Sequence, residues 1–210
     1  MNYTNLITII IPCYNEINFL ETVIQRVLDT KIQNKQVIIV DDFSTDGTRE
    51  LLKSKIEPLV DKVIYHEKNM GKGACIKNAL QFIAGDIVII QDADLEYNPS
   101  DHPKLVKVMI DRNVDVVYGT RFSKGTKNSN LNLYLTNRIA NFLLTVFTNF
   151  LTGLKISDME TGLKCFKKEA IQGINLIENR FGFEPEVTIK LAKKKFKFEE
   201  IDISYYARTF

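Results

Sequence analysis

The sequence has little of what several classes of protein require. Its 210 residues include no tryptophan, three cysteines and two histidines, and the formal net charge is only +2. So small a charge gives no reason to expect nucleic acid as the main partner. Three widely separated cysteines argue against a disulfide framework and favour a reducing compartment. With two histidines and no cysteine cluster, a zinc site is not expected.

Targeting and dinucleotide-binding signatures are also missing. The first residues lead almost directly into an apolar run, without a basic region or a cleavage site of small residues, so we expect no signal peptide. No Gly-x-Gly-x-x-Gly follows that run, which argues against a nicotinamide-dependent oxidoreductase. The length, with 45% hydrophobic and 26% charged residues, is typical of one soluble globular domain.

What the chain does contain is a regular alternation of short apolar runs and helical patterns. The apolar runs read as strands buried on both faces, and they occupy residues 6–11, 37–40, 63–66 and 87–90. Their alternation with helical segments predicts a mostly parallel sheet covered by helices. The second half continues the pattern, with a helix predicted at 99–111, a strand at 114–121, a loop leading into a strand after 157, a helix at 181–195 and a strand at 198–203.

The first strand and the helix after it carry two local signals. Pro12 cannot donate to a sheet ladder, so we expect it to mark the end of the strand. Asn15 is a plausible N-cap for a helix that begins near Ile17, and Glu16 suits the positive end of that helix. Capping alone would explain both Asn15 and Glu16.

Acidic residues follow three of the predicted strands. Glu16 comes after the first strand, Asp41 and Asp42 after the second, and Asp92 and Asp94 after the fourth. In open α/β sheets ligands bind beyond the carboxyl ends of the strands, and the topology brings those ends together. The acidic residues are therefore expected to surround one ligand site.

The most acidic of these strand ends favours a metal site. Asp92 and Asp94 are two residues apart, so in an extended chain their carboxylates point the same way, and Glu96 continues the row. A hard divalent cation such as Mg²⁺ takes one or two protein carboxylates and completes its shell with phosphate oxygens and water. The alternative is an acidic turn in which Asp makes local hydrogen bonds.

Two further segments bear on function. Gly71 and Gly73 flank Lys72 at the start of a helix, an arrangement that lets the backbone approach a phosphate closely. Residues 131–154 are apolar over about the length of a membrane span, but the interior Arg138 and Asn141 argue against spanning. We expect one or two amphipathic helices at a membrane interface; packing of a long helix against the sheet is the alternative.

Together these segments resemble family-2 glycosyltransferases with the GT-A fold, and among them the polyprenyl-phosphate enzymes such as dolichyl-phosphate mannose and glucose synthases. The resemblance is carried by residues 11–16, 40–48, 69–74, 91–96, 118–121, 158–162, 181–186 and 205–209. It implies an α/β fold whose Rossmann-like, mostly parallel sheet is flanked by helices, with a smaller acceptor-side elaboration in the C-terminal half. We expect one catalytic domain over 1–210, with a nucleotide-sugar half at about 1–122 and an acceptor half at about 123–210. The family commonly continues into further, often transmembrane, helices, so truncation before membrane-associated helices is one expectation.

The resemblance also implies roles for the matching residues. Asp92, Asp94 and Arg121 are the implied catalytic residues. Residues implied to hold the nucleotide sugar are Pro12, Tyr14, Asn15, Glu16, Asp41, Asp42, Lys72, Asp92 and Arg208. The implied ligands of Mg²⁺ or Mn²⁺ are Asp92, Asp94 and Glu96, although relatives often have Gln in place of Glu96 and a bulkier residue in place of Gly162. Residues implied to bind the acceptor are Arg121, Arg138, Asp158, Glu160 and Thr161.

The activity implied is an inverting, metal-dependent transfer of a hexose from a UDP-glucose or GDP-mannose type donor to an undecaprenyl or dolichyl phosphate. Such an enzyme would act in the cytoplasm, peripherally on the cytoplasmic face of the membrane; its oligomeric state stays open. A phosphate acceptor is already anionic, so no general base is needed. Two alternatives remain: transfer to a sugar hydroxyl in cell-envelope polysaccharide synthesis, with Asp158 or Glu160 as base, and a non-catalytic nucleotide-sugar-binding module, against which intact Asp92, Asp94 and Lys72 argue.

Overall fold

A computed structural model describes residues 5–122 and 135–207 of the chain. Its centre is a seven-stranded sheet in the order β3-β2-β1-β4-β6-β5-β7, in which β6 runs antiparallel to both of its neighbours and the other pairs are parallel. The strands are β1 Ile7–Cys13, β2 Lys35–Asp41, β3 Lys62–Tyr65, β4 Ile87–Ile90, β5 Val116–Thr120, β6 Lys164–Lys167 and β7 Phe198–Asp202. The predicted mostly parallel sheet is therefore confirmed.

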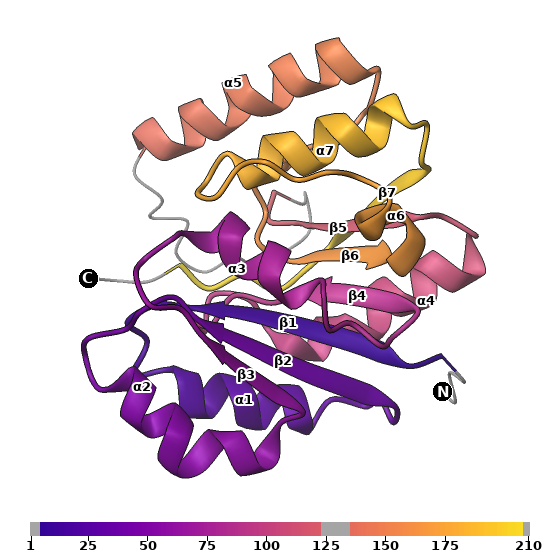
Figure 1. The fold of residues 1–210 in the computed structure, drawn as a ribbon. Helices are drawn as coiled ribbons and strands as arrows, with labels where there is room; N and C mark the ends of the chain where they lie inside the picture. Colours follow the sequence, from indigo (N-terminus) through magenta and orange to yellow (C-terminus); the bar gives the residue numbers. More distant parts are fainter. Residues whose placement is uncertain (1–4, 123–134, 208–210) are drawn as a thin grey trace.

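Helices cover both faces of the sheet (Figure 1). On one face lie α1, α2 and α4, and on the other lie α3, α6 and α7, with α5 outside α7. The α-helices are α1 Leu20–Leu28, α2 Thr48–Leu51, α3 Lys72–Ala79, α4 His102–Asp111, α5 Leu135–Thr152, α6 Lys168–Gln172 and α7 Phe183–Lys193. A π-helix, η1 Leu52–Ile56, extends α2, and short 3₁₀ turns form η2 Glu57–Leu59 and η3 Pro99–Asp101.

The continuous apolar strands follow from this three-layer arrangement. Along β1, Ile7, Ile9 and Ile11 point into the core beneath α1 and α4, while Ile10 points into the core beneath α3 and α7. All four are fully buried. A strand that is covered on both faces needs apolar side chains at successive positions, because alternate side chains enter opposite layers.

Two predictions about the first βα unit are wrong. Strand β1 does not end at Pro12, because Pro12 pairs with Val40 of β2 and the strand continues to Cys13. Pro12 lies beyond the last residue paired with β4, Ile10, so its missing N–H costs no ladder bond on that side. Helix α1 begins at Leu20 rather than near Ile17 and has no side-chain cap. Asn15 instead adopts a left-handed backbone conformation, with φ of 55°, well before the helix.

The apolar segment after residue 131 forms one helix, α5, which packs on α7 rather than into the sheet. Its inner side carries the buried side chains of Asn141, Thr145 and Thr148, and its outer side leaves large apolar side chains exposed. Among the described residues, no helix combines the length and the apolar character that crossing a bilayer requires.

Candidate functional site

A pocket of about 480 Å³ lies at the carboxyl ends of β1, β2 and β4. Its lining is Pro12, Cys13, Tyr14, Glu16, Asp42, Asn69, Gly71, Lys72, Cys75, Asp92, Ala93, Asp94, Arg180 and Phe181. A slightly larger hollow of about 530 Å³ lies beside Asp86 and Lys167, at the opposite ends of the strands. Because open α/β sheets bind ligands beyond the carboxyl ends of their strands, we take the first pocket as the candidate site.

Asp42 fixes the loop that carries Lys72. Its Oδ1 accepts hydrogen bonds from the backbone N–H of Met70 (2.8 Å) and from His66 Nδ1 (2.7 Å), and its Oδ2 accepts from the N–H of Gly71 (2.7 Å). Gly71 has φ of 97°. A Cβ at Gly71 would overlap the backbone of Asn179, so glycine is required there for conformation and for space.

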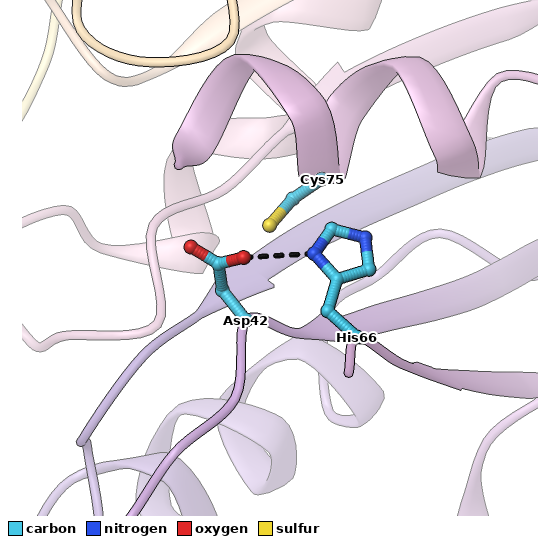
Figure 2. A group of neighbouring side chains, drawn as sticks. All are labelled: Asp42, His66 and Cys75. Carbon is cyan, nitrogen blue, oxygen red and sulfur yellow. Dashed lines mark hydrogen bonds and ion pairs between the residues drawn. The ribbon is translucent and has the colours of Figure 1, made fainter. Parts of the chain in front are cut away.

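Asp42 also belongs to a buried trio with His66 and Cys75, shown in Figure 2. His66 Nε2 lies 2.7 Å from the Asn78 amide nitrogen, which can only donate, so Nδ1 carries the ring proton and donates it to Asp42. Burial, together with the charges of Asp42 and Asp41, raises the pKa of the Cys75 thiol well above its usual value. The atoms are of metal-ligand type and lie within 4.8 Å of one another. Their hydrogen bonds, however, make the trio a support for the pocket loop.

Asp41, the neighbour of Asp42, faces away from the pocket. It is fully buried, and it accepts a hydrogen bond from Arg49 Nε at 2.7 Å. The Arg49 guanidinium in turn lies 5.3 Å from the ring centres of both Phe43 and Tyr65. Of the two acids that follow β2, the structure therefore brings Asp42 into the pocket lining and holds Asp41 in an ion pair beside it.

The segment after β1 is tied to the loop after β2. The N–H of Asn15 donates to Ser44 Oγ (2.9 Å), Asn15 Oδ1 accepts from the N–H of Thr45 (2.8 Å), and the N–H of Glu16 donates to Thr48 Oγ1 (2.9 Å). These bonds replace the helix cap that the sequence predicted for Asn15. They hold Tyr14 at the pocket, where its side chain is half exposed and available to a ligand.

The predicted row of three carboxylates is only partly formed. Strand β4 ends at Ile90, and the residues after it form bends rather than an extended strand. Asp92 and Asp94 both line the pocket. Glu96 Oε2 accepts a hydrogen bond from the Tyr205 hydroxyl at 2.9 Å, and Glu96 is not among the lining residues. Two pocket carboxylates fit Mg²⁺ or Mn²⁺, which bind oxygen donors; a role for Glu96 in that site stays a prediction.

Lys72 lines this pocket and belongs to a cluster of charged side chains. Its Nζ is 2.7 Å from Asp92 Oδ1 and 3.1 Å from Glu184 Oε1. Burial alone would lower the pKa of Lys72, but the charges of Asp92 and Glu184 outweigh it and raise the pKa above its usual value. Glu184, at the start of α7, was not predicted as a site residue. Its side chain is buried, and Oε2 has no hydrogen-bond partner within the described part of the chain.

Asp92 also packs directly against Gly162. A Cβ on Gly162 would overlap Asp92 Oδ2, so a larger residue here would displace the carboxylate. The N–H of Gly162 donates to the Tyr97 hydroxyl at 2.8 Å, which fixes the loop. A bulkier residue, which the family resemblance implies at this position, does not fit this arrangement of Asp92.

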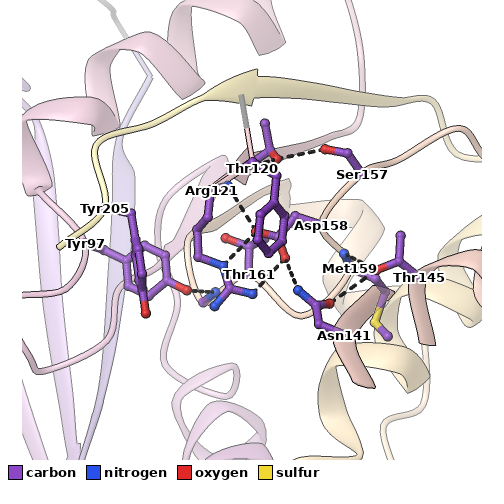
Figure 3. Close-up of polar contacts among 12 residues, drawn as sticks. Tyr97, Thr120, Arg121, Asn141, Thr145, Ser157, Asp158, Met159, Thr161 and Tyr205 are labelled. Carbon is purple, nitrogen blue, oxygen red and sulfur yellow. Dashed lines mark hydrogen bonds and ion pairs between the residues drawn. The ribbon is translucent and has the colours of Figure 1, made fainter. Parts of the chain in front are cut away.

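A second polar centre joins the end of β5 to the loop before β6 (Figure 3). Arg121 contacts Asp158 through Nε–Oδ2 at 2.7 Å and Nη2–Oδ1 at 2.8 Å, and its backbone N–H donates to Oδ2 at 3.0 Å. Asn141 of α5 donates to Asp158 Oδ1 at 3.0 Å. The Arg121 guanidinium also lies 5.4 Å from the ring centre of Tyr205. Asp158 is fully buried, and both of its oxygens are used in this way.

The loop that contains the remaining predicted acceptor residues is held by a buried cation. Lys164 Nζ donates to the carbonyl oxygens of Met159 (2.8 Å) and Thr161 (2.6 Å), and burial lowers the pKa of Lys164 to about 8. Thr161 is fully buried. Burial and the charge of Glu184 raise the pKa of Glu160 above its usual value. Glu160 therefore binds a proton more readily than an ordinary glutamate.

Of the two other predicted arginines, the structure describes only Arg138. Arg208 lies outside the described residues. Arg138, on α5, is exposed and lines a separate hollow of about 410 Å³. The other residues that line this hollow are Phe122, Phe142, Thr145, Val146, Asn149, Ile156 and Ser157.

Sequence reasoning missed Glu184, His66 and Cys75. Glu184 belongs to a segment that carries the family resemblance, but nothing in that segment indicates its contact with Lys72. His66 and Cys75 come from separate elements, and nothing in their spacing indicates that both lie close to Asp42.

Comparison with known proteins identifies relatives over nearly the whole length of the chain. The family model described as "Glycosyl transferase family 2" matches residues 8–174. A dolichol-phosphate mannosyltransferase of Pyrococcus furiosus is 30% identical over 205 residues, covering 96% of this chain and 57% of that protein. A UDP-N-acetylglucosamine–dolichyl-phosphate N-acetylglucosaminyltransferase of Methanococcus voltae is 29% identical over 217 residues, covering 94% of this chain and 84% of that protein. The chain thus spans less than two thirds of the Pyrococcus protein.

Solved structures confirm the predicted GT-A fold. The mannosyltransferase PcManGT of Pyrobaculum calidifontis, solved with GDP-Man and Mn²⁺, superposes with a TM-score of 0.71 at 20% identity, covering 99% of this chain and 58% of that one. Glucosyl-3-phosphoglycerate synthase of Mycobacterium tuberculosis, solved with Mn²⁺ and UDP-Glc, also gives a TM-score of 0.71 at 20% identity, covering 99% of this chain and 72% of that one.

Proposed function

The chain belongs to glycosyl transferase family 2, and from this membership we propose that it transfers a hexose from a nucleoside diphosphate sugar to a polyprenyl phosphate, with inversion at the anomeric carbon. The observation that carries the proposal is the pocket at the strand ends, which is lined by Asp92, by Asp94 and by Lys72, whose ammonium group contacts Asp92. Carboxylates and an ammonium group together suit a metal-bound diphosphate.

On the donor side, we assign a binding role to each residue from its position at the pocket. Asp92 and Asp94 would hold Mg²⁺ or Mn²⁺, which when bound stabilises the negative charge on the leaving diphosphate. Lys72 would add a second positive charge beside that diphosphate. Residues at and after the ends of β1 and β2 would hold the base and ribose: Pro12, Tyr14, Asn15, Glu16 and Asp42, with Asp41 supporting them through its ion pair with Arg49.

On the acceptor side, we assign the phosphate to Arg121 and Arg138. A guanidinium is planar and matches the geometry of phosphate oxygens. Asp158 holds the plane of the Arg121 guanidinium in one orientation, which favours recognition of an anion in a defined position. The attacking phosphate oxygen is already negatively charged, so the chain needs to orient it rather than deprotonate it.

Transfer to a sugar hydroxyl is the second candidate, and of its two possible bases, Asp158 and Glu160, we favour Glu160. Asp158 is unsuited to proton transfer, because it is fully buried and both of its oxygens accept hydrogen bonds. Glu160 is partly exposed, and its raised pKa suits a group that takes up a proton. A glutamate in this state supports a hydroxyl acceptor.

The outer surface of α5 supports action at a membrane surface. The apolar side chains exposed on it include Phe142, Leu143, Phe147 and Phe150, the last of which is 84% exposed. So continuous an apolar surface on an amphipathic helix is suited to the boundary between headgroups and acyl chains. We propose that α5 lies on the cytoplasmic face of a bilayer, which would bring a lipid acceptor to the adjacent hollow lined by Arg138.

A radiolabelled transfer assay tests the proposed function. The protein is incubated with Mn²⁺ and either UDP-[¹⁴C]glucose or GDP-[¹⁴C]mannose, with undecaprenyl or dolichyl phosphate in detergent, or with a hydroxyl acceptor oligosaccharide. We expect label to enter the organic phase with one donor and a lipid phosphate, and Asp92→Asn to abolish this transfer. Label in the oligosaccharide alone would favour the second candidate, and no transfer to either acceptor by a protein that binds the nucleotide sugar would indicate a non-catalytic binding module.

A further inference from the structure

Lys72 lies between two carboxylates in the described structure, and one of them is the proposed metal ligand. Its Nζ is 2.7 Å from Asp92 Oδ1 and 3.1 Å from Glu184 Oε1. Lys72 begins α3 and Glu184 lies in the first turn of α7, so the ammonium group bridges two separate helices as well as the loop after β4. The three side chains are 17%, 22% and 4% exposed for Lys72, Asp92 and Glu184, so water screens their charges only weakly.

Asp92 has little freedom to bind the Lys72 ammonium group and a divalent cation at the same time. Its Oδ2 packs against Gly162 so closely that a Cβ there would overlap it, and its Oδ1 contacts Lys72. A divalent cation that binds Asp92 therefore meets the Lys72 ammonium at the same carboxylate. Two like charges a few ångströms apart repel strongly in a partly buried site.

Glu184 offers Lys72 a second position. One Glu184 oxygen already contacts Nζ, while Oε2 is buried and has no hydrogen-bond partner in the described residues. An ammonium group has three donors and can contact both oxygens of one carboxylate. Movement of Nζ from Asp92 towards Glu184 would satisfy the buried Oε2 and free Asp92 Oδ1 together.

We propose that Lys72 competes with the divalent cation for Asp92 in the nucleotide-free protein, and that Glu184 is the positioning residue that holds Lys72 when the cation binds. This inference rests on the proposed function, in which Asp92 is a metal ligand. The diphosphate of the donor adds negative charge beside Lys72, and this charge also favours movement of Nζ away from Asp92. Metal binding is consequently weak without nucleotide and strong with it, a positive coupling between the two ligands.

The test measures Mn²⁺ binding directly, by the electron paramagnetic resonance signal of free Mn²⁺, without nucleotide and then with UDP or GDP. Without nucleotide, Lys72→Gln should tighten Mn²⁺ binding and Glu184→Gln should weaken it, each by about tenfold, the lower end of the range for partners of metal ligands. For UDP or GDP the effect of Lys72→Gln should be the opposite: loss of the ammonium group should weaken binding of the nucleotide. In the double variant K72Q/E184Q, the effect of the Glu184 substitution should largely disappear, because there is no ammonium left to position.

A matched control comes from the exposed ion pair of Lys55 and Glu21, which is 3.4 Å long and lies on other helices. Lys55→Gln and Glu21→Gln make the same charge changes and should leave Mn²⁺ affinity unchanged. Lys72→Arg keeps the charge and guards against a folding defect in Lys72→Gln; it should bind Mn²⁺ as weakly as the unmodified protein. Unfolding by urea shows that each variant is folded.

Three results would overturn the inference: unchanged or weaker Mn²⁺ binding by folded Lys72→Gln, tightening by Lys72→Arg equal to that by Lys72→Gln, or an equal effect of Glu184→Gln with and without Lys72. Measurements on Asp92→Asn distinguish failure of the proposed competition from failure of the proposed function. If Asp92→Asn removes Mn²⁺ binding while Lys72→Gln changes nothing, only the competition is wrong. If Asp92→Asn binds Mn²⁺ normally, the metal site of the proposed function is wrong, and the inference fails with it.

Discussion

The guanidinium of Arg121 and the carboxylate of Asp158 form a two-point ion pair with contacts of 2.7 and 2.8 Å, and the Asp158 side chain is completely buried. The pair connects the end of β5 to the loop before β6, and Asn141 extends it to α5. Removing one member of a buried ion pair leaves the other charge desolvated without compensation, which costs much more than the net value of the pair.

We therefore expect Asp158→Asn to lower the free energy of unfolding by about 3 kcal/mol. The same change should raise the KM for the lipid phosphate more than that for the nucleotide sugar, because Arg121 loses its fixed orientation. Urea unfolding and steady-state kinetics measure the two effects. Asp111→Asn, in an exposed pair with Lys107 on α4, is the control and should change neither. A larger loss of donor affinity than of acceptor affinity would contradict the assignment of Arg121.

Asp94→Asn should abolish turnover while the protein stays folded. Asp94 lines the pocket beside Asp92, and loss of one carboxylate removes both a proposed metal ligand and the charge that balances the metal. We expect at least about a hundredfold decrease in kcat in assays that contain Mn²⁺, with an unchanged unfolding transition. A rate near that of the unmodified protein would reject Asp94 as a ligand.

Gly162→Ala should weaken donor and metal binding, because the new Cβ would overlap Asp92 Oδ2. The overlap should also cost about 1–3 kcal/mol of stability, as overpacking usually does. Gly153→Ala is the contrast, since a Cβ there meets no atom within 4 Å although its φ of 74° disfavours alanine. That control should lose some stability but no affinity for UDP, GDP or Mn²⁺ in calorimetry. If the two variants lose equal affinity, the contact with Asp92 is not the cause.

The buried Lys164 should make stability depend on pH. Burial lowers its pKa to about 8 from the usual 10.5, so between these two values the unfolded chain binds more protons at this site than the folded one. Stability therefore rises with pH across that window, by up to about 3 kcal/mol from this residue. The measurement is the difference in unfolding free energy between the unmodified protein and Lys164→Met, at several values from pH 7 to 10.5. A difference that does not change with pH would show that Lys164 keeps an ordinary pKa.

Exposed phenylalanines of α5 should drive association with membranes. The double substitution Phe147→Ser and Phe150→Ser should reduce sedimentation with phosphatidylglycerol vesicles by about tenfold or more, since each buried aromatic side chain contributes roughly 1.5–3 kcal/mol. Leu59→Ser, at a position 55% exposed on η2, is the control and should bind vesicles normally. Undiminished binding by the α5 variant would place the membrane contact elsewhere.

Much of the fold could be predicted from local patterns. Runs such as Ile7–Cys13 and Ile87–Ile90 are apolar at almost every position because both faces of the sheet are covered, and this pattern can be recognised without knowing which strands lie beside them. The place of β6 could not be predicted in this way. It lies antiparallel between β4 and β5, and the order and direction of strands depend on contacts between residues far apart in the chain.

The same distinction between local pattern and tertiary contact applies to the candidate site. The sequence by itself determined that acidic residues follow the strands, that Lys72 enters a helix between two glycines, and that the chain resembles family-2 glycosyltransferases. Only the tertiary structure decided that Asp42 rather than Asp41 lines the pocket, that Glu96 meets Tyr205, and that Glu184 lies beside Lys72. The physical reason is that local patterns specify which residues end a strand or begin a helix. The partner that each charged side chain meets depends on packing between separate elements, which no local pattern records.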